Sequence, residues 1–225
     1  TSHRYVAERA LKLMKRDAEN TNLITCHLGN GASITAIENG KSIDTSMGFT
    51  PLEGLVMGTR SGDIDPAILG FLEDRGYSAR DLNSIVNKKS GLLGLSGISN
   101  DLRDLEAAVD VGNKNAIEAL EVYAHRVRKY IGAYSAELFK VDGLVFTGGI
   151  GQHGVRMRER ICHRLENIGI IMDYSKNEAN GRKEGIVSTP YSPTTILVIP
   201  TNEELQIALD VVEVAFPGKP DSECA

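Results

Sequence analysis

The segment NLITCHLGNGASITAIENGKSIDT, residues 22–45, contains two Asn-Gly pairs between stretches rich in apolar and β-branched residues. Asn-Gly between such stretches is the strongest short signal for a hairpin, because a type I′ turn needs positive φ at two successive positions. The pairs Asn30-Gly31 and Asn39-Gly40 therefore predict two tight turns. Together they predict a three-stranded antiparallel meander over residues 22–45.

The segments around the meander follow an order typical of an α/β protein. Before it, apolar spacing predicts an amphipathic helix over residues 3–16. After it, strands are predicted at 142–147 and 195–199, each leading through a turn into a helix, at 153–167 and from about 202 to 214. A meander followed by strand–turn–helix units predicts an α/β architecture with a mixed sheet and flanking helices. The end of the chain, residues 216–225, is expected to fray.

The longest predicted helix spans about residues 114–139. Its apolar stripe is too short for a sustained coiled coil and is typical of a helix in a core or a dimer interface. It suggests a homodimer. The stripe has three-four spacing and consists of Ile117, Leu120, Ala124, Val127, Ile131, Tyr134 and Leu138.

Charge and composition exclude several classes of function. The formal net charge of −5 argues against nucleic acid as a partner, because such proteins need a basic face. No apolar run approaches membrane-spanning length, so no membrane partner is predicted. The three scattered cysteines lack metal-ligand spacing and are typical of reduced thiols in the cytoplasm. The chain opens inside a helical pattern without methionine, which suggests a piece of a larger protein.

A glycine-rich segment, TSMGFTPLEGLVMGTRSGDIDP at residues 45–66, places one arginine among small residues. It favours neither a helix nor a strand, but it can hold the guanidinium of Arg60 for phosphate or carboxylate recognition. Asp63 is a candidate partner for Arg60 or a loop hydrogen-bonding group. Asp65 before Pro66 fits an N-cap with proline at the first helical position. This segment is the predicted centre of the chemistry.

Two glycine turns are candidate phosphate sites. The turn from His27 to Gly31 could present backbone N–H groups to an anion, although a plain hairpin turn with His27 as a strand residue explains this motif better when it is taken alone. Gly148–Gly151 lies between a predicted strand and helix, where close backbone approach suits a nucleotide, or it is a tight connection only. Neither turn carries the Rossmann or the P-loop pattern. A third glycine-rich stretch, 91–97, is predicted to be a loop.

Acidic residues elsewhere have both structural and functional readings. Thr201 and Glu204 have capping-box spacing, which leaves Glu203 free at a strand end, where a carboxylate suits Mg²⁺. Asp101 and Arg103 could contact a ligand, or Asp101 could cap the next helix. The nucleophile elbow and the His-Glu-x-x-His motif are both absent, so hydrolases of the first kind and zinc enzymes of the second are excluded.

These segments together resemble the acetokinase family. The likeness rests on Thr1-Ser2-His3, the turn at 27–31, the segment 44–66, the stretch 146–151 and the stretch 200–204, in family order and over nearly the whole chain. It implies the ribonuclease-H-like fold of actin, Hsp70 and the sugar kinases. It also implies that residues 1–225 form the nucleotide-binding C-terminal domain of a two-domain kinase, with the helix at about 202–214 packing toward the N-terminal domain.

The resemblance implies a Mg²⁺-dependent phosphotransferase that converts acetate and ATP into acetyl phosphate and ADP. Arg60 would stabilise the transition state, Pro51 would line the acid pocket and Glu203 would hold the metal. The implied ATP-binding residues are His27, Leu28, Gly29, Asn30, Gly31, Asp101, Leu102, Arg103, Gly148, Gly149, Ile150, Gly151 and Gln152.

Some family elements would lie upstream of Thr1, including a phosphate-binding hairpin and a catalytic aspartate. The chain alone is therefore expected to bind nucleotide weakly without turnover. Two alternatives stay open: a propionate or butyrate kinase of the same family, and a non-catalytic nucleotide-binding or dimerisation module. Gln152 and His153 stand where the family has an acidic residue or asparagine, a change that backbone-mediated binding tolerates.

Overall fold

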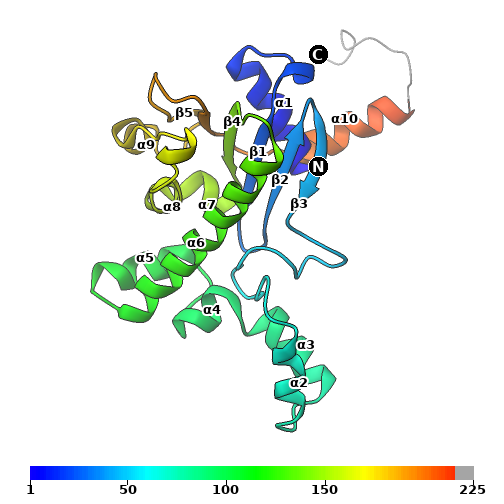
Figure 1. The fold of residues 1–225 in the computed structure, drawn as a ribbon, viewed down its shortest axis with the longest axis vertical. Helices are drawn as coiled ribbons and strands as arrows, with labels where there is room; N and C mark the ends of the chain where they lie inside the picture. Colours follow the sequence, from blue (N-terminus) through cyan, green and yellow to red (C-terminus); the bar gives the residue numbers. More distant parts are fainter. Residues whose placement is uncertain (216–225) are drawn as a thin grey trace.

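The computed structural model describes residues 1–215 and shows an α/β fold around one six-stranded mixed sheet (Figure 1). The strand order is β3-β2-β1-β4-β6-β5. The strands are β1 (Leu23–Leu28), β2 (Ala32–Glu38), β3 (Lys41–Thr45), β4 (Gly143–Thr147), β5 (Gly185–Ile186) and β6 (Thr195–Val198). The helices are α1 (Ser2–Met14), α2 (Ala67–Glu73), α3 (Ala79–Lys88), α4 (Gly91–Ser96), α5 (Leu102–Asp110), α6 (Lys114–Glu137), α7 (Gly148–His153), α8 (Val155–Cys162), α9 (Tyr174–Asn180) and α10 (Glu203–Ala215), with 3₁₀ turns at Ala18–Asn20 and Glu166–Ile168.

The predicted meander is confirmed. β1 pairs antiparallel with β2, and β2 pairs antiparallel with β3. Asn39 and Gly40 have φ of 50° and 77°, the positive pair that a type I′ turn requires. The type I′ prediction is wrong for the first turn, because neither Asn30 nor Gly31 has positive φ. The carbonyl of Asn30 instead accepts a hydrogen bond from Gly58 at 2.9 Å, so a distant segment shapes this turn.

The two predicted later strands are also confirmed, and they lie in the middle of the sheet. β4 pairs parallel with β1, and β6 pairs parallel with β4. The carboxyl ends of these three strands therefore meet at one edge, which is where open α/β sheets bind ligands.

The long helix α6 covers one face of the sheet, and α4, α5 and α8 pack against α6. Its side chains Leu120, Ala124, Val127 and Ile131 are completely buried against this chain's own core. The prediction of a core helix is confirmed, whereas the stripe does not form a free surface for a second copy. The predicted homodimer loses that support.

Helix α1 covers the opposite face of the sheet and confirms the predicted amphipathic helix. Val6, Ala7 and Ala10 pack against apolar side chains of β1, β2, β4 and β6, namely Leu23, Ile37, Val145 and Leu197. The helix ends where Lys15 takes the left-handed conformation. Burial of this stripe is what holds α1 on the sheet.

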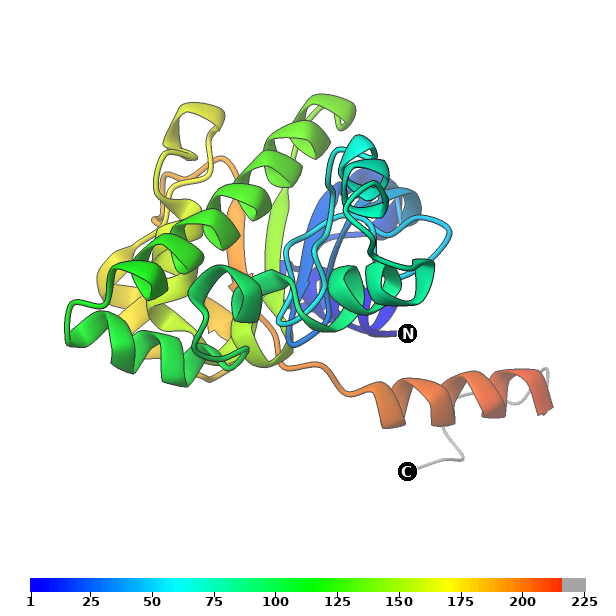
Figure 2. The same ribbon diagram turned by 90° about the horizontal axis from the view of Figure 1, so that it is seen from below.

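The last described helix, α10, extends away from the sheet beyond α1 (Figure 2). Its large apolar side chains are exposed, including Leu205, Ile207, Leu209 and Val211. The predicted fraying of residues 216–225 lies outside the described residues. None of the helices described between residues 1 and 215 is long and apolar enough to cross a membrane.

Two glycine-rich predictions are wrong in detail. Residues 91–96 form helix α4 rather than a loop, because the N–H groups of Leu92 and Leu93 bond the carbonyls of Met57 and Gly58 at 2.8 and 3.0 Å and anchor a helical turn. Gly148 begins helix α7 directly, so that glycine segment is a helix start rather than a turn before a helix at 153. Helix α4 therefore lies beside the Arg60 segment, and the start of α7 lies at the carboxyl end of β4.

Candidate active site

Two glycine segments meet at the carboxyl ends of β1 and β4. β1 continues into the turn 29–31, and β4 runs directly into α7 at Gly148. Gly148 has φ of +76°, and a Cβ on it would lie 2.7 Å from the carbonyl oxygen of Leu28. Only glycine permits this approach. The two candidate phosphate turns of the sequence are therefore neighbours in space.

A cavity of about 510 Å³ opens beside these two segments. Several of the predicted nucleotide-binding residues line it: Gly29, Asn30, Asp101, Leu102, Arg103, Gly149 and Ile150. Other predicted residues of the same segments do not: His27, Leu28, Gly31, Gly148, Gly151 and Gln152. The lining also includes residues that the sequence did not select for the site, namely Asn100, Glu106, His153 and Arg182. Asn100 adjoins a selected motif, but Arg182 carries no local signal.

Asn30 is the best anchored residue of the first turn. Its carbonyl accepts from Gly58, and its Oδ1 accepts from Nδ2 of Asn100 at 2.8 Å. A Cβ on Gly58 would lie 2.1 Å from that same Oδ1. The turn is thus tied both to the Arg60 segment and to the segment before α5, which fixes its backbone at the mouth of the cavity.

Arg60 reaches over the first turn. Its guanidinium NH1 donates to the carbonyl of Pro51 at 3.2 Å and contacts the sulfur of Met57 at 3.4 Å. A Cβ on Gly31 would lie 3.3 Å from NH1. No carboxylate within the described part of the chain pairs with this guanidinium, so its other donors are free for a ligand anion. Pro51, the predicted acid-pocket residue, lies next to it.

Of the two roles that the sequence allowed for Asp63, the structure shows the loop hydrogen-bonding group and not the partner of Arg60. Its Oδ1 accepts from the N–H of Gly54 at 2.8 Å, and its Oδ2 accepts from the hydroxyl of Tyr130 at 2.8 Å and pairs with Arg126 at 3.3 Å. Asp63 therefore holds the loop on α6. Asp65 bonds the start of α2, where its Oδ1 accepts from the N–H of Ala67 at 2.9 Å.

Asp101 confirms the capping role that the sequence allowed, and it also lines the cavity. Its Oδ1 accepts from the N–H of Arg103 at the start of α5, and its carboxylate pairs with the Arg103 guanidinium at 2.6 Å. The Arg103 hydrogen bonds lower the pKa of Asp101 to about 2. Asp101 thus caps α5 and also holds the guanidinium of Arg103 at the rim of the cavity.

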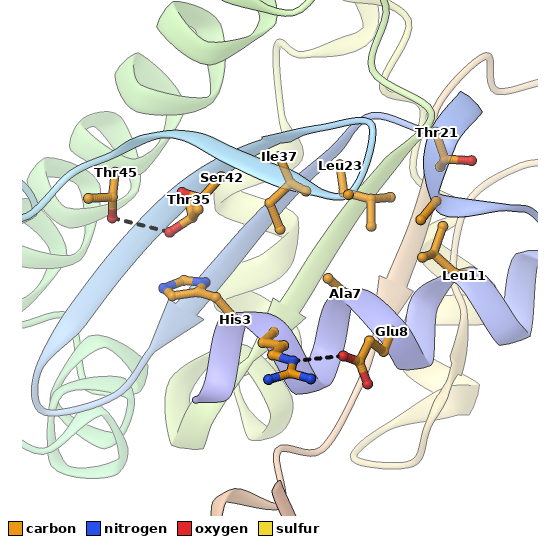
Figure 3. A pocket seen from close by; sticks show the side chains of 13 residues that line it. His3, Ala7, Glu8, Leu11, Thr21, Leu23, Thr35, Ile37, Ser42 and Thr45 are labelled. Atoms are coloured by element: carbon orange, nitrogen blue, oxygen red, sulfur yellow. Dashed lines mark hydrogen bonds and ion pairs between the residues drawn. The ribbon is translucent and has the colours of Figure 1, made fainter. Parts of the chain in front are cut away.

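A second cavity, of about 550 Å³, lies between α1 and the meander (Figure 3). His3 projects from α1 toward the strands there. Its Nδ1 and Nε2 are hydrogen-bonded to the hydroxyls of Thr25 and Ser33, each at 2.8 Å. Its ring lies 6.3 Å from that of His27. Burial, reinforced by His27, lowers the pKa of His3 to about 4. Burial also lowers the pKa of His27, against the opposing effect of Glu203.

The buried ring of His3 predicts a loss of stability in mild acid. Above pH 6.5 the His3 ring is neutral in both the folded and the unfolded chain. Between pH 6.5 and 4 the unfolded chain takes up the proton first. The free energy of unfolding should therefore fall by at most about 3 kcal/mol over this window. Urea denaturation at a series of pH values measures it.

The substitution His3→Gln should flatten this pH dependence, leaving the smaller part due to His27. The matched variant His125→Gln removes an exposed histidine of α6 and should keep the full slope. Equal slopes in the two variants would contradict the assignment to His3.

Glu203 lies at the start of α10, close to the start of α1. The hydroxyl of Ser2 donates to its Oε1, and the hydroxyl of Thr201 donates to Ser2 at 3.1 Å. The predicted capping box is wrong, because Asn202 caps α10 by accepting from the N–H of Leu205 at 3.0 Å. Within residues 1–215 no group of three or more His, Cys, Asp or Glu side chains could hold a metal. A single carboxylate still fits Mg²⁺, which retains waters and binds phosphate oxygens.

The sheet order, the helices on both faces and the ligand edge define a class of fold, the ribonuclease-H-like α/β domain. The chain belongs to the acetokinase family, whose model matches residues 1–209. The predicted fold class and family are confirmed.

Individual relatives agree with this assignment. The chain is 53% identical to an acetate kinase of Desulfitobacterium hafniense over 97% of this chain and 55% of the relative. It is 55% identical to an acetate kinase of Methanosarcina thermophila over 95% of this chain and 52% of the relative. The chain thus spans about half the length of these relatives.

Solved structures show the same likeness. The crystal structure of Porphyromonas gingivalis acetate kinase superposes with a TM-score of 0.92 at 49% identity, over 95% of this chain and 54% of that one. The crystal structure of a propionate kinase from Francisella tularensis superposes with a TM-score of 0.86 at 46% identity, over 92% of this chain and 52% of that one.

Proposed function

We propose that this chain is the nucleotide-binding domain of an acetate kinase, which transfers a phosphoryl group between ATP and acetate to give acetyl phosphate and ADP. The observation that carries the proposal is the position of Arg60, whose guanidinium has no carboxylate partner among residues 1–215 and lies over the glycine turn beside the cavity. Relatives named acetate kinase at more than half identity support the choice of substrate.

The cavity supplies the nucleotide site in this proposal. The turn from His27 to Gly31 holds the phosphates, while Asp101 to Arg103 and Gly148 to Gln152 lie along the adenosine side. The hydrogen bonds from Gly58 and Asn100 to Asn30 keep the phosphate turn in place before ligand arrives. Such preorganisation lowers the cost of ordering the site on binding.

Arg60 carries the catalytic role in this proposal. Phosphoryl transfer depends on positioning and on neutralising charge rather than on covalent chemistry. The guanidinium contacts the phosphoryl group in transfer, and its bond to the carbonyl of Pro51 places it beside the acid pocket. Glu203 would hold Mg²⁺, which supplies positive charge to the phosphate oxygens.

Two features support a two-domain parent with a further domain packed on this one. The chain spans about half the length of its relatives, and α10 presents an apolar face that residues 1–215 leave exposed. We assign α10 to contact with that N-terminal domain. A homodimer in the cytoplasm completes the proposal, and the buried free thiols of Cys26 and Cys162 suit a reducing compartment.

Nucleotide binding is tested first, with Asn30→Asp as the decisive variant. A carboxylate at the phosphate turn should weaken ATP affinity by about 30-fold or more, roughly 2 kcal/mol, because it repels the phosphates. Isothermal titration of the 225-residue chain with ATP measures the effect.

A matched control is Asn113→Asp, which adds the same charge at the N-cap of α6, where aspartate caps equally well. It should bind ATP like the wild type. Equal losses in both variants would mean that net charge, not the turn, governs binding. Absence of any ATP binding by the wild type would overturn the proposed site.

Turnover is tested separately. The isolated chain should show no acetate-dependent ADP formation in a coupled assay, even at ATP concentrations that saturate its site. Ordinary rates from this chain alone would contradict the two-domain proposal.

The longer protein discriminates the remaining alternatives. Comparison of kcat/KM for acetate, propionate and butyrate decides among the acids, an open choice given the propionate kinase likeness. ATP binding without phosphorylation of any of these acids by the longer protein would identify a non-catalytic nucleotide-binding module.

A further inference from the structure

His27 and Thr147 are direct neighbours at the ends of two parallel strands. They are Cα partners in the register of β1 with β4, and parallel strands lie about 4.8 Å apart. Leu23 lies four residues before His27 on β1, and Val145 lies two residues before Thr147 on β4. An even spacing along a strand puts side chains on the same face, and Leu23 and Val145 pack under α1. The side chains of His27 and Thr147 therefore share the face of the sheet that α1 covers. The two side chains therefore lie next to each other.

Each of these residues buries a polar atom that has no partner among the described residues. These atoms are Nδ1 of His27 and the hydroxyl oxygen of Thr147. Thr147 is completely buried and occupies the N-cap position of α7 without using its side chain to cap it. Buried polar groups are normally paired, so two unpaired ones in adjacent positions require an explanation.

Polar side chains at the start of α1 already have partners. Both ring nitrogens of His3 are bonded to Thr25 and Ser33. Ser2 is bonded to Glu203 and accepts from Thr201. Nδ1 of His27 and the hydroxyl of Thr147 both lack a partner among residues 1–215 and lie on neighbouring strands.

The other nitrogen of His27 points to the glycine turn. Its Nε2 lies 3.9 Å from the position that a Cβ would take on Gly29. The ring thus presents Nε2 to the turn and Nδ1 to the buried side, where Thr147 lies. A hydrogen bond at Nδ1 would determine whether Nε2, the nitrogen that faces the turn, carries the proton of the neutral ring.

Only one direction of this bond satisfies both groups. A threonine hydroxyl has a single proton to donate, and a rotation about one side-chain bond aims it. If the hydroxyl donates to a bare Nδ1, its proton and the Nδ1 lone pair are both used. If Nδ1–H donated instead, the hydroxyl proton would stay buried without an acceptor, which costs free energy.

We propose that Thr147 is a positioning residue, whose hydroxyl donates to Nδ1 of His27 and holds the ring in the tautomer with the proton on Nε2. The N–H of Nε2 then faces the glycine turn as a hydrogen-bond donor. In the opposite tautomer a lone pair would face the turn and repel an anion. The role assigned to this donor, binding a nucleotide phosphate, rests on the proposed function.

The tautomer is measured directly by ¹⁵N NMR of the histidine rings in the 225-residue chain at pH 8, where His27 is neutral. His27→Gln identifies the His27 signals. The wild type and Thr147→Ser, which keeps the hydroxyl, should both show the proton on Nε2. Thr147→Val, of nearly the same shape, should show a mixture or the opposite tautomer.

Either of two results would overturn the proposal: a proton on Nδ1 in the wild type, or unchanged His27 signals in Thr147→Val. Should Thr147→Val not fold, as judged by circular dichroism, the wild-type tautomer together with that of Thr147→Ser decides the question. These spectra need no nucleotide.

Binding of ADP supplies the second readout. Thr147→Val should weaken the affinity by about three- to tenfold, while Thr147→Ser should stay within twofold of the wild type. Equal affinities in Thr147→Val and the wild type would overturn the positioning role. A wild type that binds no ADP yet has the proton on Nε2 would refute the proposed function and leave the tautomer assignment supported.

Discussion

Gly91→Ala should destabilise the chain by about 3 kcal/mol or more, because the new Cβ would collide with backbone atoms in a left-handed position. Gly91 has φ of +63°, and a Cβ there would lie 2.2 Å from the carbonyl oxygen of Met57 and 2.8 Å from that of Arg60. Backbone atoms cannot yield as the end of a flexible side chain can. The segment that carries Arg60 must therefore move.

The contacts between α4 and the Arg60 segment also connect the stability of the chain to the candidate active site. The N–H groups of Ser90 and Leu92 donate to the carbonyls of Thr59 and Met57 at 3.0 and 2.8 Å, so α4 clamps the backbone on both sides of Gly58. Gly58 in turn bonds Asn30. The variant should consequently lose ATP affinity as well as stability, even at temperatures where it remains folded.

Gly97→Ala is the matched control for this effect. Gly97 has φ of +66°, almost the same value as Gly91, but no atom of residues 1–215 lies within 4 Å of its Cβ position. It should lose only about 1 kcal/mol, the cost of the backbone conformation itself. Urea denaturation of both variants measures the difference, and equal losses would show that conformation rather than collision is responsible.

Arg158→Met should cost about 3–5 kcal/mol, as expected when a buried hydrogen-bonded charge is removed and its acceptors remain. Arg158 is completely buried, and burial lowers its pKa to about 10. Its guanidinium donates to Oδ1 of Asn177 at 2.8 Å and to the carbonyls of Gly151, Gln152 and Gly181 at 3.0, 2.7 and 2.8 Å. Methionine fills similar space but leaves these oxygens without donors.

Arg156→Met provides the control on the same helix. Arg156 pairs with Asp110 at 2.6 Å, but both side chains are more than half exposed, so its removal should cost at most about 1 kcal/mol. Thermal and urea denaturation measure both variants. A loss below about 1 kcal/mol for Arg158→Met would contradict the structural role of the buried guanidinium.

The parts of the fold that the sequence predicted correctly depend on short-range signals. Asn39-Gly40 requires only its own positive φ values, and the stripe of α6 requires only helical spacing. Both patterns are decided within a few residues of chain. The meander, the central strands and the core helix follow from them.

The parts that the sequence could not predict depend on distant partners. Asp63 bonds Tyr130 and Arg126 on α6, although Arg60 is nearer in the chain. Residues 91–96 become helical through bonds to the Arg60 segment. Thr201, the predicted cap of α10, instead donates its hydroxyl to Ser2 at the start of α1. In each case a contact across the fold outweighed the local pattern.

The candidate site was predicted where motifs are contiguous and missed where they are not. The glycine segments and Asp101 to Arg103 were selected as short runs; two residues of each glycine segment and all three of Asp101 to Arg103 line the cavity. Arg182 reaches the same cavity from the loop after α9, where nothing in its neighbourhood marks it. The assignment of roles to these residues stays a prediction until nucleotide binding is measured.

The bonds that join Ser2 to Thr201 and Glu203 have a mechanical consequence. The first turn of α1 and the first turn of α10 are fastened together, and Arg4 pairs with Asp210 one step further along at 3.0 Å. A domain attached through either helix would swing about a single hinge formed by both. Because Glu203 is part of that hinge and His27 lies near it, any such swing would also shift these two side chains relative to the strand ends at the candidate site.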